Sequence, residues 1–343
     1  MYRPTPVRGA TRGAALIPTQ SEEDTSAHAT RPALPLVHAI VLTHRGAAFL
    51  GEGLRALLAQ EAPCRLHVCV VDNASQDGTA ALLARDFPQV QHLRLEENQG
   101  YARANNLALR RAIAAGASFA VLLNDDVETE PGFLEALLAC AAAQPAAGLI
   151  TGLLLLRGEE TVNSTGLVLD RLGRASDRDF LVPRAKLSRA AGPVAGVSGG
   201  AVLLRCAALA RVGLFDPRYF AYYEDVDLSL RAAALGIGCW YCPEAIARHR
   251  FGATFGPGSP WQRYLLGKNH LRTLALHQPL LWACALVPAT AAFRLGAKAP
   301  LELLRGHPRL ALAEVRAGFE GALAAALAVP QRLRGGIPPG AEP

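Results

Sequence analysis

The sequence predicts an α/β fold in which a mostly parallel β-sheet is flanked by helices. The first observation is a rhythm: from residue 37 onward, short apolar runs of strand length alternate with stretches of helical length and composition. Such alternation is typical of βαβ units and a parallel sheet. The second observation is that acidic or polar side chains directly follow several of these apolar runs. Because the carboxyl ends of parallel strands meet at one edge of a sheet, we expect a ligand site at that edge.

The first half of the chain contains the clearest elements. Strands are expected at residues 37–42, 66–71, 90–95 and 119–123. Helices are expected at residues 47–59, 79–85, 101–115 and 131–143. Beyond residue 143 the alternation loosens, and the expected elements are strands at 149–156 and 197–204, a helix at 224–235 and a short extended segment at 240–243. From residue 261 the pattern is mostly helical and apolar, with several prolines.

The chain divides into three parts by composition. Residues 1–34 are rich in Pro, Thr, Ala and charge without periodicity, which predicts a flexible N-terminal tail. Residues 35–259 carry the α/β pattern and form the expected main domain. Residues 260–343 form a helical extension with ten basic and four acidic side chains, and so hold the entire net charge of +6. No RNA- or DNA-binding motif accompanies these cations, so we expect an anionic lipid or polyanion, and no nucleic acid, as their partner.

Composition and cysteine content bound the class of protein. Hydrophobic residues make up 51% and charged residues 19% of the 343 residues, which excludes global disorder. The seven scattered cysteines indicate a reducing compartment rather than a disulfide framework. The first ten residues lack the apolar core of a secretory signal, and no apolar run reaches the roughly 18 residues of a membrane-spanning helix. We therefore expect a cytoplasmic protein.

The basic extension allows two interpretations. It contains two apolar stretches, residues 280–293 and 322–329, and the first is interrupted by Pro288. At about 1.5 Å per residue the first stretch reaches only about 21 Å, short of a hydrocarbon core of ~30 Å. It could therefore lie in the membrane interface, with Arg294, Lys298 and the following arginines toward anionic headgroups. Alternatively, the extension packs its apolar face on the main domain or on a second subunit.

The first candidate binding residue is Asp72, which ends the apolar strand expected at 66–71. At the ligand edge of the sheet, its carboxylate could accept the N3–H of a uracil or thymine base. The following Asp77-Gly78-Thr79 would turn the chain into the next helix. The alternative is that both aspartates serve only to cap and turn the chain.

The second candidate segment runs from Asn98 through Gly100 to Asn105. A glycine next to a helix start allows another group to approach the backbone closely, and the helix N-terminus favours a phosphate. Taken alone this pattern is weak, because many loops share it.

The third candidate is the pair Asp125-Asp126, which follows the strand expected at 119–123. Adjacent carboxylates repel each other unless a cation lies between them and the substrate. A hard divalent cation that bridges to a diphosphate would explain the pair. The alternative is a solvated turn before the next helix.

The fourth candidate is the acidic start of the helix expected at 224–235, which contains Glu224 and Asp225. Acids in a first turn also complement the helix dipole, which is the purely structural interpretation. Here, however, they follow four aromatic residues within residues 219–223. A site with stacking walls and an acid is therefore favoured.

Taken in this order, the segments resemble the family-2 inverting glycosyltransferases of the GT-A fold, in particular the bacterial rhamnosyltransferase-like members. The resemblance covers residues 37–251 and rests on VVDNASQDGT, NQGYARANN, LLNDDV, GGAVLLR with GLFDPRYFAYYEDVDLSLR, and PEAIARH. The first strand ends in Thr43-His44-Arg45, where relatives more often have Thr-Tyr-Asn. His44 is therefore expected to alter the nucleotide edge.

The resemblance implies a role for each candidate. Asp225 matches the catalytic base, and Glu224 is its neighbour on the acceptor side. Asp126 matches a direct ligand of a divalent metal, Mn²⁺ or Mg²⁺, and His249 matches a histidine that completes the metal site. The residues implied in binding the donor are Thr43, Asp72, Asn98, Gly100, Asn105 and Asp125.

The resemblance further implies transfer of a sugar from a nucleotide diphosphate to a glycan or polyprenyl-linked acceptor in cell-envelope polysaccharide synthesis. The expected place is the inner face of the cytoplasmic membrane, and the oligomeric state is left open. Rhamnose from dTDP-rhamnose is the first choice of donor, followed by a UDP-hexose or UDP-galactofuranose. A nucleotidyltransferase would need a Gly- and Lys-rich loop, which Thr43-His44-Arg45-Gly46 matches poorly. A catalytically idle, membrane-associated binding protein would be expected to lose carboxylates that are present here.

Overall fold

The computed structural model describes residues 33–188, 190–250 and 258–333. The tail expected at residues 1–34 therefore lies almost entirely outside the described residues, as do the last ten residues of the extension. The described chain from Leu34 onward belongs to one compact unit. The division into a main domain and an extension at residue 259 stays a prediction.

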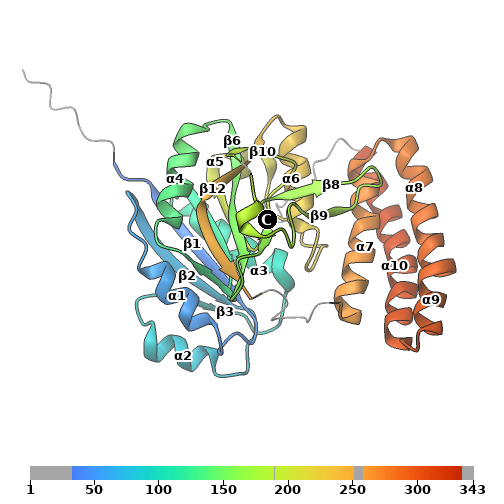
Figure 1. Cartoon of the computed structure of the whole chain (residues 1–343), viewed down its shortest axis with the longest axis horizontal. Helices are drawn as coiled ribbons and strands as arrows, with labels where there is room; N and C mark the ends of the chain where they lie inside the picture. The colour runs from blue at the N-terminus through green and yellow to red at the C-terminus, as the bar shows by residue number, and fades with distance from the viewer. Residues whose placement is uncertain (1–32, 189, 251–257, 334–343) are drawn as a thin grey trace, which may run out of the picture. The chain divides into compact units, whose positions relative to one another are not determined.

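Four parallel strands form the half of the sheet that comes first in the sequence (Figure 1). They are β1 (Leu36–Thr43), β2 (Arg65–Asp72), β3 (Gln91–Arg94) and β4 (Phe119–Asn124). The intervening helices are α1 (Leu50–Leu58), α2 (Thr79–Asp86) and α3 (Gly100–Ala114). The pairing of β1 with both β2 and β4 is parallel, so their carboxyl ends meet at one edge. The expected strand–helix alternation is confirmed in this half.

The other half of the sheet is mixed. β11 (Ala201–Arg205) runs antiparallel between β4 and β6 (Ala147–Leu156), and β12 (Gly238–His249) pairs in parallel with β6. The strand expected at 197–204 thus begins only at residue 201, and the segment expected at 240–243 belongs to a strand of 12 residues. Five short strands were not expected: β5 (Val127–Thr129), β7 (Val162–Ser164), β8 (Leu167–Leu169), β9 (Ala175–Asp177) and β10 (Gly192–Val194).

Two layers of helices bury the two faces of the sheet. One apolar cluster packs α1 and α4 (Phe133–Ala143) on the first face. A second cluster packs α3, α5 (Cys206–Val212) and α6 (Glu224–Ala234) on the other. Because both faces are covered, the central strands read as nearly continuous apolar runs. The three-layer arrangement leaves the edge at the strand carboxyl ends open for a ligand.

The C-terminal quarter is helical, as expected. It consists of α7 (Pro260–His277), α8 (Leu280–Phe293), a π-helical turn (Arg294–Lys298), α9 (Ala299–Leu304) and α10 (Pro308–Leu333). Figure 1 shows these helices gathered into one group, with α10 beside α7.

Buried polar contacts attach α7 to the loop before α6 and to α6 itself. Nδ2 of Asn269 donates to the carbonyl oxygens of Ala221 and Tyr222. Arg272 lies 2.8 Å from the buried Asp216. These contacts couple the position of α7 to that of the α6 N-terminus.

The expectation that no helix is long enough to cross a membrane was wrong. Helical structure continues without a break from Leu280 to Leu304, a run of 25 residues whose length and mean hydropathy suffice for a membrane span. Pro288 lies inside α8 and does not end it. The charge of Arg294 ended the apolar stretch in the sequence, but this side chain is buried against Glu314. One such helix by itself is weak evidence of a membrane span, since core helices of soluble proteins can have the same length and composition.

Candidate active site

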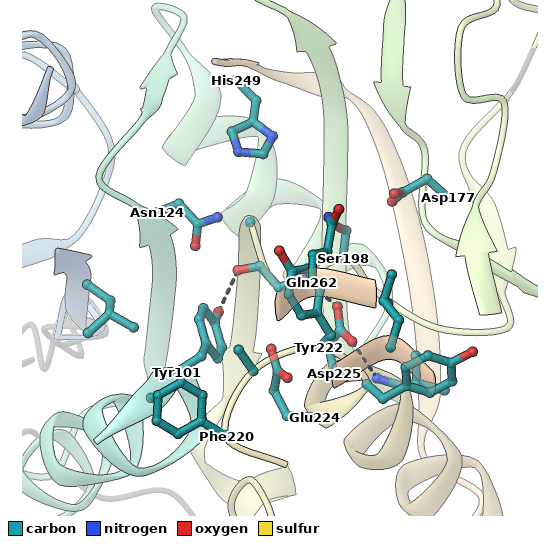
Figure 2. A pocket seen from close by; sticks show the side chains of 18 of the residues that line it. Tyr101, Asn124, Asp177, Ser198, Phe220, Tyr222, Glu224, Asp225, His249 and Gln262 are labelled. Carbon is teal, nitrogen blue, oxygen red and sulfur yellow. Dashed lines mark hydrogen bonds between the residues drawn. The ribbon is translucent and has the colours of Figure 1, made fainter. Parts of the chain in front are cut away.

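A pocket of about 300 Å³ opens where the carboxyl ends of β1, β2 and β4 face the first turn of α6. Figure 2 shows Asp225 and Glu224 below this pocket and His249 above it. The residues singled out from the sequence that line it are Asn98, Gly100, Asp125, Asp126, Glu224, Asp225 and His249. The structure thus gathers both acidic pairs around one cavity, although about 100 residues separate them in the chain.

The remaining candidates, Thr43, Asp72 and Asn105, are buried and do not line this pocket. Asp72 ends β2, where its Oδ1 accepts from the backbone N–H of Ser75 at 2.8 Å. Its Oδ2 has no hydrogen bond with any described residue. Asn105 donates to the carbonyl oxygen of Tyr101 on α3. Their roles in donor binding stay predictions.

Gly100 marks a close approach, as its position before a helix predicted. Its φ is +73°, and a Cβ atom there would lie 2.4 Å from the carbonyl oxygen of Phe220. The approaching group is therefore the aromatic loop before α6, and no residue but glycine fits without displacing it. This contact ties the start of α3 to the loop that leads to Glu224 and Asp225.

Burial strongly perturbs Asp125, the first of the two acids after β4. It raises the pKa of Asp125 to about 7, and the adjacent Asp126 carboxylate adds to the rise. The hydroxyl of Thr43 and the backbone N–H of His44 act in the opposite direction. Two carboxylates in this setting favour a bound cation, because a cation would offset their repulsion.

Asp126 and His249 form the candidate metal centre. Oδ1 of Asp126 is buried without a hydrogen bond to any described residue, and it lies 3.1 Å from Nε2 of His249. Nδ1 of His249 lies 2.6 Å from Oδ1 of Asn163. When Nδ1 donates its proton to that oxygen, Nε2 keeps its lone pair for a metal. An oxygen and an imidazole nitrogen suit Mn²⁺ or Mg²⁺.

The pair would supply only part of a coordination sphere. Within the described ranges, no group of three or more His, Cys, Asp or Glu side chains could hold a metal ion. Substrate oxygens and water would have to provide the other ligands, as is usual for Mg²⁺. The residues present therefore fit a metal that binds together with a diphosphate.

Asp225 is held rigidly at the start of α6. Its Oδ2 accepts from the backbone N–H of Gly199 at 2.9 Å, and its Oδ1 accepts from that of Val226 at 2.8 Å. Burial raises the pKa of both Asp225 and Glu224, and for Glu224 the neighbouring Asp225 adds to the rise. A carboxyl group with a raised pKa and a fixed orientation is suited to general acid–base work.

The aromatic loop forms a wall of the pocket. Phe220, Tyr222 and Tyr223 line it, whereas Tyr219 is fully buried and bonds to Thr273 on α7. Tyr222 and Tyr223 both have φ near +70°, a strained conformation for residues with a Cβ atom. The strain directly precedes Glu224 and Asp225, as is common where a backbone presents functional groups.

The sequence analysis gave no role to several residues that line the pocket, among them Asp177 and Tyr101. Asp177 lies on the short strand β9, and burial raises its pKa to about 6, with Asp225 adding to the rise. Tyr101 donates its hydroxyl proton to the carbonyl oxygen of Gly199 at 2.6 Å, next to Asp225 (Figure 2). Tyr101 belongs to a segment already singled out, but a three-residue strand gives no sequence signal that would mark Asp177.

The fold is that of the GT-A class. The chain superposes on GalNAc-T7, solved with UDP, GalNAc and Mn²⁺, with a TM-score of 0.57 and 14% identity over 72% of this chain and 48% of that one. The mannosyltransferase PcManGT of Pyrobaculum calidifontis, solved with GDP-Man and Mn²⁺, gives a TM-score of 0.50 and 20% identity over 88% of each chain. At these identities the likeness shows the fold, and the expected GT-A architecture with C-terminal helices is confirmed.

The chain belongs to glycosyl transferase family 2, whose family model matches residues 39–210. It is 31% identical over 231 residues to the N-acetylglucosaminyl-diphospho-decaprenol L-rhamnosyltransferase of Mycobacterium tuberculosis. That alignment covers 61% of this chain and 74% of the relative. The resemblance to rhamnosyltransferase-like members of the family is confirmed.

Proposed function

We propose that this chain is a metal-dependent, inverting glycosyltransferase that moves rhamnose from dTDP-rhamnose to a polyprenyl-linked glycan. The observation that carries the proposal is Asp225, whose carboxylate is fixed by two backbone N–H groups and faces the pocket that Asp126 and His249 line. A base and a candidate metal centre that share one cavity are the two parts that a single displacement needs.

Asp225 accepts the proton of the acceptor hydroxyl in this mechanism. The acceptor oxygen forms a bond to the anomeric carbon while the bond from that carbon to the nucleoside diphosphate breaks on the opposite face. The configuration at the anomeric carbon therefore inverts. A positioned carboxylate of this kind contributes about 10²–10⁴-fold to the rate. Glu224 lies beside it on the acceptor side.

The donor side of the pocket holds and orients the nucleotide diphosphate. Asp126 and His249 would hold Mn²⁺ or Mg²⁺. The bound metal would neutralise negative charge on the departing diphosphate. Asp72 reads the pyrimidine base, and Thr43, Asn98, Gly100, Asn105 and Asp125 shape the surrounding edge. Nδ1 of His44 lies 2.7 Å from the carbonyl oxygen of Asn73, so its ring has a fixed place on the pocket wall.

The relative from Mycobacterium tuberculosis supports the choice of sugar and acceptor. Its name assigns it an L-rhamnosyl transfer to a diphospho-decaprenol that carries N-acetylglucosamine. A UDP-hexose or UDP-galactofuranose donor is the second candidate. It is supported by a neighbour of the same fold that was solved with UDP and GalNAc.

The helical extension would bring the enzyme to its lipid-linked acceptor. Its helices α8–α10 expose large apolar side chains, among them Leu281 at 85%, Leu304 at 86% and Phe319 at 65%. Apolar side chains on this scale, beside a net charge of +6, support a peripheral place on the inner face of the cytoplasmic membrane. The domain from residue 35 to 259 would then carry the catalysis in the cytoplasm, within cell-envelope polysaccharide synthesis.

A transfer screen tests the proposal. The full chain is incubated with dTDP-rhamnose, UDP-glucose, UDP-galactose or UDP-galactofuranose, with N-acetylglucosaminyl-diphospho-polyprenol as acceptor, and with Mn²⁺, Mg²⁺ or EDTA. We expect rhamnose transfer that needs the metal and yields the inverted anomer, read by NMR of the product. Transfer with a retained configuration, or no turnover of any donor, would overturn the mechanism.

A further inference from the structure

A second pocket of about 340 Å³ adjoins the active-site pocket. The two cavities share four lining residues, Ala175, Tyr223, Gln262 and Leu266. The rest of the second pocket, which we call the basic pocket, is lined by the turn before β9, by α7 and by the π-helical turn and α10.

The basic pocket gathers more cations than its acid can balance. Arg174, Arg263, Arg294 and Lys298 line it, and Glu314 is the acid among its described lining residues. Glu314 is fully buried and already pairs with three of these cations: Arg294, Arg263 at 3.5 Å and Lys298 at 4.0 Å. Arg174 is exposed, and it lies more than 80 residues before these helices in the sequence.

Acids outside the pocket offset little of this excess. Arg263 has a second partner, Glu302 at 3.2 Å, whereas Arg174 forms no ion pair within the described part of the chain. Burial lowers the pKa of Lys298, and the nearby Arg294, Arg174 and Arg263 lower it further. Cations that repel one another in a partly enclosed cavity are stabilised by a bound anion.

His270 also lines the basic pocket but contributes no positive charge to it. Nε2 of His270 lies 3.1 Å from the carbonyl oxygen of Leu172, and burial lowers the pKa of this imidazole to about 4. The ring is therefore neutral at physiological pH and adds no charge. The positive charge comes from arginine and lysine, which keep it across that range and bind phosphate through charge-assisted hydrogen bonds.

We propose that the basic pocket binds the diphosphate of a polyprenyl-diphosphate-linked acceptor, and so places the first sugar of that acceptor in the active-site pocket. This inference rests on the proposed function for its acceptor. A sugar attached directly to a diphosphate requires two adjoining cavities, one for the ring and one for the anion, and the shared wall of Tyr223 and Gln262 gives that arrangement. Leu266, 38% exposed, offers an apolar surface beside both.

Binding of isoprenoid diphosphate without metal tests the inference apart from catalysis. In EDTA the acidic active-site pocket repels a diphosphate, so titration of farnesyl diphosphate reports on the basic pocket. We expect calorimetry to show binding that weakens about tenfold or more in the double variant Arg174→Ala, Lys298→Ala. Loss of one charge-assisted hydrogen bond already costs about that factor. Farnesol, which has no phosphate, should not bind.

The matched control is the double variant Arg171→Ala, Arg309→Ala, which removes two exposed cations outside the pocket, one from the same turn as Arg174 and one from α10. It should bind farnesyl diphosphate as the native chain does. Arg174→Ala alone, at an exposed site, covers the case in which the double variant fails to fold. Equal affinity of the native chain and the Arg174 variants would overturn the inference. The same variants are also tested for binding to phosphatidylglycerol vesicles. If they lose vesicle binding but keep their affinity for farnesyl diphosphate, the cations serve a lipid headgroup surface and the inference is overturned.

The outcomes separate this inference from the proposed function. Isoprenoid diphosphate binding that needs Arg174 and Lys298, in a chain that turns over no sugar nucleotide, would leave the basic pocket standing and remove the proposed function. Active transfer with an unchanged KM for the lipid-diphosphate acceptor in the double variant would do the reverse.

Discussion

The two adjoining pockets differ in the sign of their charge. The active-site pocket is walled by Asp125, Asp126, Asp177, Glu224 and Asp225, whereas the basic pocket has four cations and one acid. Under the two proposals, a diphosphate enters the first together with a metal and the second directly. Two diphosphate ligands would thus be directed to different pockets, according to whether a metal ion accompanies them. The comparison teaches that strand ends and helix starts supply the acids, while most of the cations come from the basic C-terminal helices.

The largest effect is expected from Asp225→Asn, which removes the proposed base from the acidic pocket. The amide cannot accept the proton of the acceptor, so the turnover number should fall by about 10²–10⁴-fold. Nucleotide binding should stay within a few-fold, because Asp225 bonds to Gly199 and Val226 rather than to the donor side. Initial rates and calorimetry measure the two quantities.

Asp177→Asn is the matched control, since it neutralises another buried acid of the same pocket. It should retain turnover to within about tenfold, less than the 10²–10⁴-fold that a positioned proton acceptor contributes. If Asp177→Asn loses as much as Asp225→Asn, or if Asp225→Asn turns over at the native rate, Asp225 is not the base.

The second effect concerns a buried contact between α6 and α7. Asp227 of α6 is buried between Arg231 at 2.9 Å and His277 of α7 at 2.8 Å. Asp227→Asn leaves both partners without their counter-charge, and breaking such a buried pair costs about 3 kcal/mol. We expect urea unfolding at pH 7 to show a loss of this size. The exposed Asp86→Asn, which removes the partner of Arg85, should change little.

The same pair predicts a pH dependence. Burial alone would raise the pKa of Asp227, but Arg231 and His277 outweigh it and lower the pKa below its usual value. A depressed carboxyl pKa stabilises the fold above the unfolded pKa of about 3.9 and loses that contribution as the pH falls through the folded pKa. The stability gap between the native chain and Asp227→Asn should therefore narrow below about pH 4. A gap that widens on acidification would contradict this account.

Sequence patterns predicted the acidic pocket far better than the basic one. The strand expected at 119–123 became Phe119–Asn124, because a strand covered on both faces is a plain apolar run. The acids that follow such strands then meet at one edge by topology alone. No such rule predicts the basic pocket from the sequence. Arg174 and Lys298 are 124 positions apart, and only tertiary packing brings them to one cavity.

Two failures have local physical causes. The strand that carries Asp177 is three residues long, too short for the alternation that identifies a strand. The apolar stretch at residues 280–293 ends at a charge in the sequence, yet the apolar helix continues to Leu304, and the charge of Arg294 is buried against Glu314.

The third effect sharpens the claim that the acidic pocket needs a metal. Asp126→Ala and His249→Ala each remove one side of the 3.1 Å contact between the two proposed ligands. Each should weaken Mn²⁺-dependent binding of dTDP by roughly 10–100-fold, the range found even for residues that only support ligands. Calorimetry with Mn²⁺ and with EDTA measures the metal-dependent part.

His307→Ala is the control, since this histidine pairs with Glu302 in the C-terminal helices and not with the pocket. It should leave the metal dependence of dTDP binding unchanged. Full metal dependence in His249→Ala would show instead that this imidazole is structural.

The smallest effect concerns the large apolar side chains that α8, α9 and α10 expose. Leu304 ends α9 and is 86% exposed, so burying it in a membrane interface would gain up to about 1.5–3 kcal/mol, less if immersion is partial. Leu304→Ser should therefore weaken sedimentation with phosphatidylglycerol vesicles by up to about tenfold, while the exposed Leu34→Ser, outside the extension, should not. The cations should make the binding fall with added salt, since surface charges are screened within about 10 Å at 0.1 M. A native chain that stays in solution with both anionic and neutral vesicles would leave these helices only a packing role, on the sheet domain or on a second copy of the chain.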